Sequence, residues 1–170
     1  MRAACCSIVW AGGLCLGLLV LQPAALANCE LVTGNVAATP DSRFIASGEI
    51  VIDAVTGLVW KQVPEAPSTW AAAQAAAAAD STAGFDDWRL PSRQELASIV
   101  ETGCVLPSLN TSFFVHGVNA LWSSTASVDG RAWYVHFGHG YESTENTAVA
   151  FGARFVRGGN VPLFLDGFEP

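Results

Sequence analysis

The sequence predicts a single α+β domain, in which strands come first, two helices follow and further strands end the chain. Three observations lead to this prediction. Short β-favouring runs lie on either side of a turn within residues 49–61. Helix-start signals precede residues 70–79 and 93–100, and an alternating apolar pattern marks residues 132–137. Because helices and strands do not alternate, we expect two helices packed on a small, mostly antiparallel sheet with long loops.

The N-terminus has the pattern of a signal peptide. Arg2 precedes an apolar stretch at residues 8–20, and Ala25-Leu26-Ala27 is the small-x-small pattern that a signal peptidase cleaves. We therefore expect residues 1–27 to be removed and the protein to be secreted or periplasmic, with no membrane insertion afterwards. A lipoprotein that begins at Cys29 and an uncleaved anchor are the alternatives.

Cleavage would leave 143 of the 170 residues, a length that suits one domain. The removed segment holds one of the eight basic residues and none of the fifteen acidic ones, so seven basic against fifteen acidic residues give a net charge of −8. This balance disfavours nucleic acid, anionic membranes and sulfated polysaccharides as general partners.

Two cysteines remain after cleavage, Cys29 and Cys104. In an oxidising compartment we expect one disulfide between them. A loop of this length would be stabilised by about 3–5 kcal/mol in the chain-entropy model. Two free thiols are the weaker alternative, and a metal site built on two cysteines is weaker still.

The first elements after the cleavage site are an arm and a hairpin. Residues 28–48 are polar and rich in turn formers, so we expect an N-terminal arm outside the core. Residues 49–53 and 57–61 are β-favouring, and Gly57 can supply a positive φ between them. They predict a β-hairpin.

The next segment predicts a linker and a helix. Prolines bound residues 63–67, after which Ser68 or Thr69 can cap a helix from Trp70 to about Ala79. The alanines of this helix give high propensity but little apolar area. We therefore expect the helix to pack against the sheet.

The segment FDDWRLPSRQEL at residues 85–96 joins a turn to a second helix. Ser92 and Glu95 have the spacing of a capping box, and apolar residues then recur at helical spacing. We expect this helix to end near Gly103-Cys104. We interpret the motif as a structural centre, with Arg89 paired to Asp86, Asp87 or Glu95, because such motifs fix a turn more often than they bind a ligand. Its residues are Asp87, Trp88, Arg89, Leu90, Pro91 and Glu95.

The remaining chain predicts a loop followed by strands. Residues 105–118 form an expected long loop anchored by two phenylalanines, and residues 121–125 begin a strand. Residues 132–137 alternate, which predicts a half-buried strand with Tyr134 and His136 on one face. A polar return and a last strand pair are expected at residues 141–146 and 149–157.

Five elements occur in a specific order along the chain: Asp53-x-x-Thr56-Gly57-Leu58-x-Trp60, Asp87-Trp88-Arg89-Leu90-Pro91 with Glu95-Leu96, Trp122-Ser123-Ser124, Ala132-Trp133-x-Val135-x-Phe137 and Val156-Arg157. This series resembles the DUF1566 family, also called the C-terminal domain of the Legionella collagen-like protein (Lcl). The resemblance covers residues 49–159 and leaves residues 160–170 as a tail. It implies a C-type-lectin-like fold in an exported bacterial protein.

The named member of that family is an adhesin that binds glycosaminoglycans. Since this chain is acidic and has no Gly-x-y stalk, glycosaminoglycan binding is not expected here. The calcium signatures of sugar-binding C-type lectins are also missing from the sequence. The R-L-P-x-x-x-E-L piece is similar to formylglycine-generating enzymes, but these need reactive cysteines late in the chain, and none follows Cys104.

The function that we expect is a non-enzymatic binding or adhesion module that recognises a glycan or a cell-surface protein, without a cofactor or metal. A structural envelope-associated protein with no small ligand is the alternative, and an enzyme is far behind. The long loops are the expected binding region, because fold-building segments leave them free. The candidate ligand residues are Asn110, His116, His139, Tyr141 and Glu142.

Overall fold

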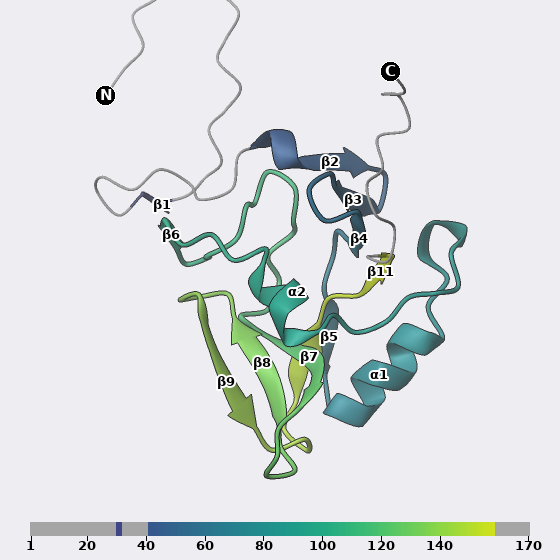
Figure 1. The fold of residues 1–170 in the computed structure, drawn as a ribbon, viewed down its shortest axis with the longest axis vertical. Helices are drawn as coiled ribbons and strands as arrows, with labels where there is room; N and C mark the ends of the chain where they lie inside the picture. Colours follow the sequence, from purple (N-terminus) through teal and green to yellow (C-terminus); the bar gives the residue numbers. More distant parts are fainter. Residues whose placement is uncertain (1–29, 32–40, 159–170) are drawn as a thin grey trace, which may run out of the picture.

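A computed structural model describes residues 30–31 and 41–158 and confirms the predicted α+β class. Two helices and two mostly antiparallel sheets make up this part of the chain (Figure 1). The sequence predicts one sheet, whereas the structure has two. Helix α2 (Arg93–Ala97) lies where these two sheets meet. The C-type-lectin-like assignment stays a prediction.

The first sheet has the strand order β5-β10-β7-β8-β9, and β9 forms its outer edge (Figure 1). Neighbouring strands are antiparallel except β10 and β7, which run parallel with Gly152 opposite Leu121. The β8–β9 pairing sets His136 opposite Tyr141 and Tyr134 opposite Ser143. The strands are β5 (Glu65–Ser68), β7 (Ala120–Ala126), β8 (Ala132–His136), β9 (Tyr141–Glu145) and β10 (Phe151–Ala153).

The second sheet has the antiparallel order β11-β4-β3-β2. It contains the predicted hairpin, and Gly57 adopts the expected positive φ of 70° in the turn. Asp53 organises that turn, because its carboxylate accepts hydrogen bonds from the amide of Val55 and the hydroxyl of Thr56. The strands are β2 (Phe44–Ser47), β3 (Ile50–Asp53), β4 (Leu58–Lys61) and β11 (Val156–Gly158).

Helix α1 (Trp70–Ala78) begins where the sequence predicts, with Thr69 as its N-cap. It packs against β7 and β10 through its buried alanines, and the Trp70 indole donates to the carbonyl of Ser123 at 2.7 Å. Helix α2 (Arg93–Ala97) packs against β7 and β8, on the opposite face of the first sheet. Two one-turn 3-10 segments complete the helical elements, η1 (Asp41–Arg43) and η2 (Thr82–Gly84).

Four sequence-based expectations differ from the structure. The segment 44–47 of the predicted arm is strand β2, and Phe44 lies in the core. The predicted linker contains β5, which pairs with β10. Helix α2 ends at Ala97, because the chain turns there and Val100 pairs as a bridge with Leu109. The last two strands do not pair with each other, since β10 joins the first sheet and β11 the second.

The core forms two clusters. One lies under α2 and between the sheets, and it includes Trp60, Phe114 and Val135. The other lies under α1 and includes Trp88, Trp122 and Phe155. Of the tryptophans in the described residues, Trp60, Trp88 and Trp122 are core residues, whereas Trp70 and Trp133 are partly exposed.

A two-residue strand pair holds the start of the described chain. Strand β1 (Glu30–Leu31) runs antiparallel to β6 (Cys104–Val105), with Leu31 opposite Cys104. Cys104 is buried. Cys29 lies outside the described residues, as do the predicted signal peptide and the C-terminal tail, so the Cys29–Cys104 disulfide stays a prediction.

Candidate functional site

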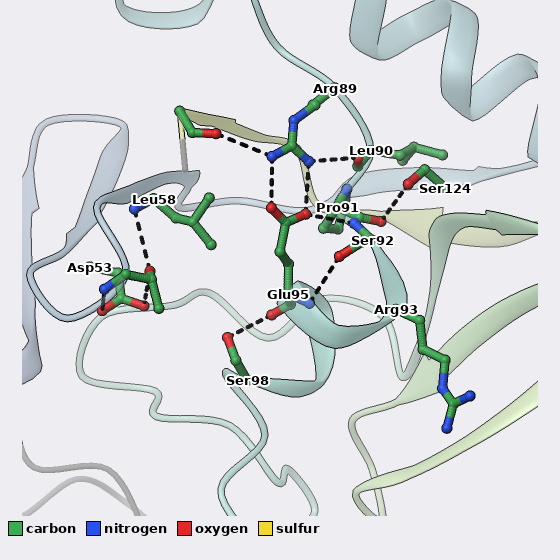
Figure 2. A network of polar contacts seen from close by, with 12 residues as sticks. Asp53, Leu58, Arg89, Leu90, Pro91, Ser92, Arg93, Glu95, Ser98 and Ser124 are labelled. Carbon is green, nitrogen blue, oxygen red and sulfur yellow. Dashed lines mark hydrogen bonds and ion pairs between the residues drawn. The ribbon is translucent and has the colours of Figure 1, made fainter. Parts of the chain in front are cut away.

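The DWRLP segment forms a compact polar network at the start of α2 (Figure 2). The Arg89 guanidinium donates to both carboxylate oxygens of Glu95, at 2.8 and 2.7 Å. Glu95 also accepts from the Ser92 amide at 2.7 Å, while the Ser92 hydroxyl accepts from the Glu95 amide at 3.2 Å. The predicted capping box is confirmed, and of the three acidic partners considered for Arg89, Glu95 forms the pair.

This network connects the two sheets. Arg89 exchanges backbone hydrogen bonds with Val156 of β11 and donates to the carbonyl of Gly158 at 3.2 Å. Two residues later, the carbonyl of Pro91 accepts from the amide and the hydroxyl of Ser124 in β7. One short segment therefore touches β11 of the second sheet and β7 of the first, which is a structural role.

The other motif residues also serve the fold. Trp88 is buried and its indole donates to the carbonyl of Thr82 at 3.1 Å. Leu90 and Pro91 are buried as well. Asp87 pairs with Arg157 at 2.5 Å, and this hydrogen bond lowers the pKa of the Asp87 carboxyl. The hydrogen bonds from Arg89 likewise lower the pKa of Glu95.

We expect Arg89→Ala to lower the free energy of unfolding by about 1–2 kcal/mol, because it removes a bidentate ion pair whose arginine is 43% exposed. Urea unfolding measures this loss, and ligand binding per folded molecule should not change. Arg131→Ala is the matched control, since its pair with Glu145 is long, at 3.4 Å, and exposed. A stable Arg89→Ala protein that had lost binding would contradict the structural role.

A shallow cavity of about 260 Å³ lies beside this network, lined by Thr56, Leu58, Gln94, Glu95 and Ser98. Its polar side chains are largely engaged within the protein. The Thr56 hydroxyl donates to Asp53, the Ser98 hydroxyl donates to the carbonyl of Glu95, and the Glu95 carboxylate holds Arg89. The cavity therefore offers few free groups to orient a ligand.

A second candidate site lies on the outer half of the first sheet, on the face that α1 covers elsewhere. Aromatic side chains from β8, β9 and β10 contact one another there. Tyr134 packs against Phe151 with ring centroids 4.6 Å apart, and Tyr141 meets Tyr134 edge-on at 6.3 Å. We call this surface the aromatic strip, and it comprises Tyr134, His136, His139, Tyr141 and Phe151.

The strip combines ring surfaces with hydroxyl groups. Tyr141 is 46% exposed, and the other rings are partly or well exposed. Burial raises the pKa of the Tyr134 hydroxyl, and the neighbouring Tyr141 hydroxyl raises it further. Ser143 is opposite Tyr134 on β9. A surface of this kind can stack on an apolar ring face and hydrogen-bond the groups around it.

The Arg93 side chain covers the opposite face of β8 and β9. The Arg93 guanidinium lies 3.8 Å from the centre of the Trp133 ring and forms an ion pair with Glu142. Glu142, a predicted ligand residue, is thus engaged in covering this face. The Trp133 ring face that meets the guanidinium is not free to stack on a ligand.

The structure places the predicted ligand residues at different depths. His139 and Tyr141 belong to the aromatic strip, and exposed His116 lies near one end of it, bonded to Asn119. Asn110 is 3% exposed, and its side chain accepts from the Ser112 amide within its own turn. An interior Asn110 does not share a surface with the strip.

Sequence reasoning did not select Tyr134, His136 or Phe151 as ligand residues. A signal for the first two was present, because the alternation in residues 132–137 put them on one face. Phe151 had no local signal, since it reaches the strip only through the long-range placement of β10.

Together, the two sheets, the motif that links them and the partly exposed aromatic strip make up a small α+β domain. The chain belongs to the Lcl C-terminal domain family, whose model matches residues 49–157. Membership is consistent with a bacterial surface or secreted module. No curated protein matches this chain in sequence. Within residues 30–31 and 41–158, no helix has the length and apolar character needed to cross a membrane.

Proposed function

We propose that this protein is an exported, non-enzymatic binding module that recognises a glycan through the aromatic strip. The observation that carries the proposal is the open cluster of Tyr134, Tyr141 and Phe151, next to a helix that covers the rest of the same sheet face. Tyr141 is exposed beside the helix, and Tyr134 and Phe151 are partly exposed while they pack against the core under α1. An exposed aromatic cluster on a small domain marks a binding surface.

The chemistry of the strip favours an uncharged glycan. Sugar rings have apolar faces that pack on aromatic rings and hydroxyls that pair with polar groups such as Tyr134, Tyr141 and Ser143. The acidic residue at the far end of β9, Glu145, is paired with Arg131. With a strongly acidic chain around it, the strip should repel sulfated or uronic polymers rather than attract them.

Export of the protein is part of the same proposal. The signal-peptide pattern at residues 1–27 supports it, and the Cys29–Cys104 disulfide is expected as a consequence of export. Strand β1 begins at Glu30, directly after Cys29, and pairs with the strand that contains Cys104.

A glycan array tests the proposal. The purified protein should bind a subset of uncharged glycans at pH 7.5, equally with calcium and with chelator. We expect Tyr141→Ala to weaken binding at least tenfold, because a stacked aromatic ring at the centre of a site contributes about 1.4 kcal/mol or more.

Val55→Ala is the matched control, because Val55 is also apolar and 67% exposed but lies on the β3–β4 turn of the other sheet. It should bind like the wild-type protein. An array that remained blank at pH 7.5, or responses confined to sulfated glycans, would contradict recognition of an uncharged glycan by the strip.

A further inference from the structure

The three histidines of the chain gather at one end of the aromatic strip. The His136 ring is stacked with the Tyr141 ring at 4.9 Å and 6°, and with the His139 ring at 5.4 Å and 5°. His116 bonds Asn119 at 3.1 Å, and that Asn119 oxygen lies 3.2 Å from the position of a Cβ on Gly138. We call this group the histidine corner.

The His136 ring is tightly enclosed on one side. A Cβ on Gly138 would lie 2.8 Å from His136 Cε1 and 3.2 Å from Nδ1, so the glycine backbone packs directly against the ring. Within residues 30–31 and 41–158, His136 Nδ1 is buried and has no hydrogen-bond partner. The polar backbone of His136 itself raises the pKa of the ring, but burial and the neighbouring His139 outweigh it, so the net direction is downward.

The groups around the His136 ring would also not stabilise a positive charge on it. His139 faces it from the turn after β8, Tyr141 from β9, Ala120 from β7, and Asn119 with His116 from the preceding loop. Of these groups, His139 is the one that stacks on the His136 ring and can place a second positive charge against it. Burial and the proximity of His139 lower the pKa of His136, so the folded corner favours the uncharged ring.

We propose that the histidine corner makes the aromatic strip acid-sensitive, so that the strip is intact and binds its glycan at neutral pH and opens at the 137–140 turn on mild acidification. The stack holds while both imidazoles are uncharged. Once both are protonated, two parallel cationic rings 5.4 Å apart repel each other, and the turn that carries His139 moves away. The identity of the released ligand as a glycan rests on the proposed function.

The direction of the effect follows from the lowered pKa. The unfolded or opened chain binds the proton more readily than the closed corner, so falling pH favours the opened state. The stability that the uncharged His136 ring gives the closed corner is fully present above the pH range in which histidine ordinarily titrates. It is lost as the pH falls through that range.

An NMR titration of the purified protein from pH 8 to pH 5 tests the opening directly. The imidazole Cε1–H signal of His136 should titrate below the ordinary histidine range. The ring signals of Tyr141 should shift in the same transition, because they lose a stacked neighbour. In His139→Gln the His136 midpoint should move up towards the ordinary histidine range. His116→Gln, outside the stack, should leave the His136 midpoint unchanged.

The array of uncharged glycans, read at pH 7.5 and at pH 5.5, tests the consequence for binding. Relative to each protein's own signal at pH 7.5, signals should fall at least fivefold at pH 5.5 in the wild-type protein and in His116→Gln, but less than twofold in His139→Gln, whatever the glutamine does to binding at pH 7.5. A His136 midpoint that is not below the ordinary histidine range, or equal glycan signals at both pH values, would overturn the inference. If the NMR transition occurs while no glycan binds at either pH, the acid-driven opening is supported and the proposed function fails.

Discussion

Replacing Arg154 with methionine is expected to lower the free energy of unfolding by about 3–5 kcal/mol. The Arg154 side chain is 1% exposed and lies over the Phe114 ring at 5.1 Å. Burial lowers its pKa to about 9, so the group is still charged at neutral pH. It donates to the carbonyls of Lys61 and Val115, at 2.8 and 2.7 Å, and to that of Gln62.

The cost is large because the three carbonyls belong to separate parts of the chain. Two lie at the end of β4 and one in the loop before β7, so Arg154 ties this loop to the second sheet. Methionine fills a similar volume but leaves the carbonyls without their buried donor. Urea unfolding gives the free energy. Arg93→Ala is the control, since Arg93 also lies on an aromatic ring but is 40% exposed, and it should cost under 1 kcal/mol. An Arg154→Met loss below 1 kcal/mol would refute the role.

Replacing Asp53 with asparagine is expected to cost about 3 kcal/mol at pH 7. The Asp53 side chain is fully buried, and it accepts from Arg43 at 2.9 and 2.5 Å. Arg43 in turn donates to the carbonyl of Ser98 at 2.9 Å, just after α2. The pair therefore holds the β3–β4 turn against the end of the helix, and asparagine would leave the largely buried Arg43 guanidinium without its counter-ion.

The same substitution should change the acid stability of the protein. Burial alone would raise the pKa of Asp53, but hydrogen bonds from Arg43, Thr56 and the Val55 amide hold it below the ordinary value. The carboxylate thus contributes stability above its unfolded pKa of about 4, and this contribution is lost as the pH falls through the folded pKa.

Thermal melting between pH 7 and pH 2 measures this dependence. The wild-type curve should fall steeply below pH 4, and the Asp53→Asn curve should start lower and fall less. Glu145→Gln, which alters an exposed pair, should run parallel to the wild-type curve. Parallel curves for Asp53→Asn and the wild-type protein would show that Asp53 does not carry this acid sensitivity.

The elements that the sequence predicts well are those whose signals are local. The Ser92–Glu95 capping box is contained within four residues, and the alternation of residues 132–137 needs only one exposed face and one buried face. Gly57 supplies the hairpin turn that its neighbours require. In each case the physical cause lies within a few residues, so no partner has to be known.

The elements that the sequence misses depend on distant partners. Residues 149–157 are β-favouring, but their division between two sheets is set by Phe151 pairing with Ser68 and Val156 pairing with Trp60. The role of Arg154 follows from that division, because it lies between β10 and β11 and is carried into the core. The aromatic strip is predictable only in part. Tyr134 and His136 follow from the local alternation of residues 132–137, whereas Phe151 joins the strip through the long-range pairing of β10.

Chemical-shift mapping of the isotope-labelled protein, titrated at pH 7.5 with an uncharged oligosaccharide that binds on the array, locates the binding site. We expect the largest shifts at the amides and rings of Tyr134, His136, Tyr141 and Phe151. Shifts centred on Gln94 and Ser98 in the shallow cavity, or on Trp133 and Glu142 on the opposite face, would contradict the assignment of the aromatic strip as the binding site.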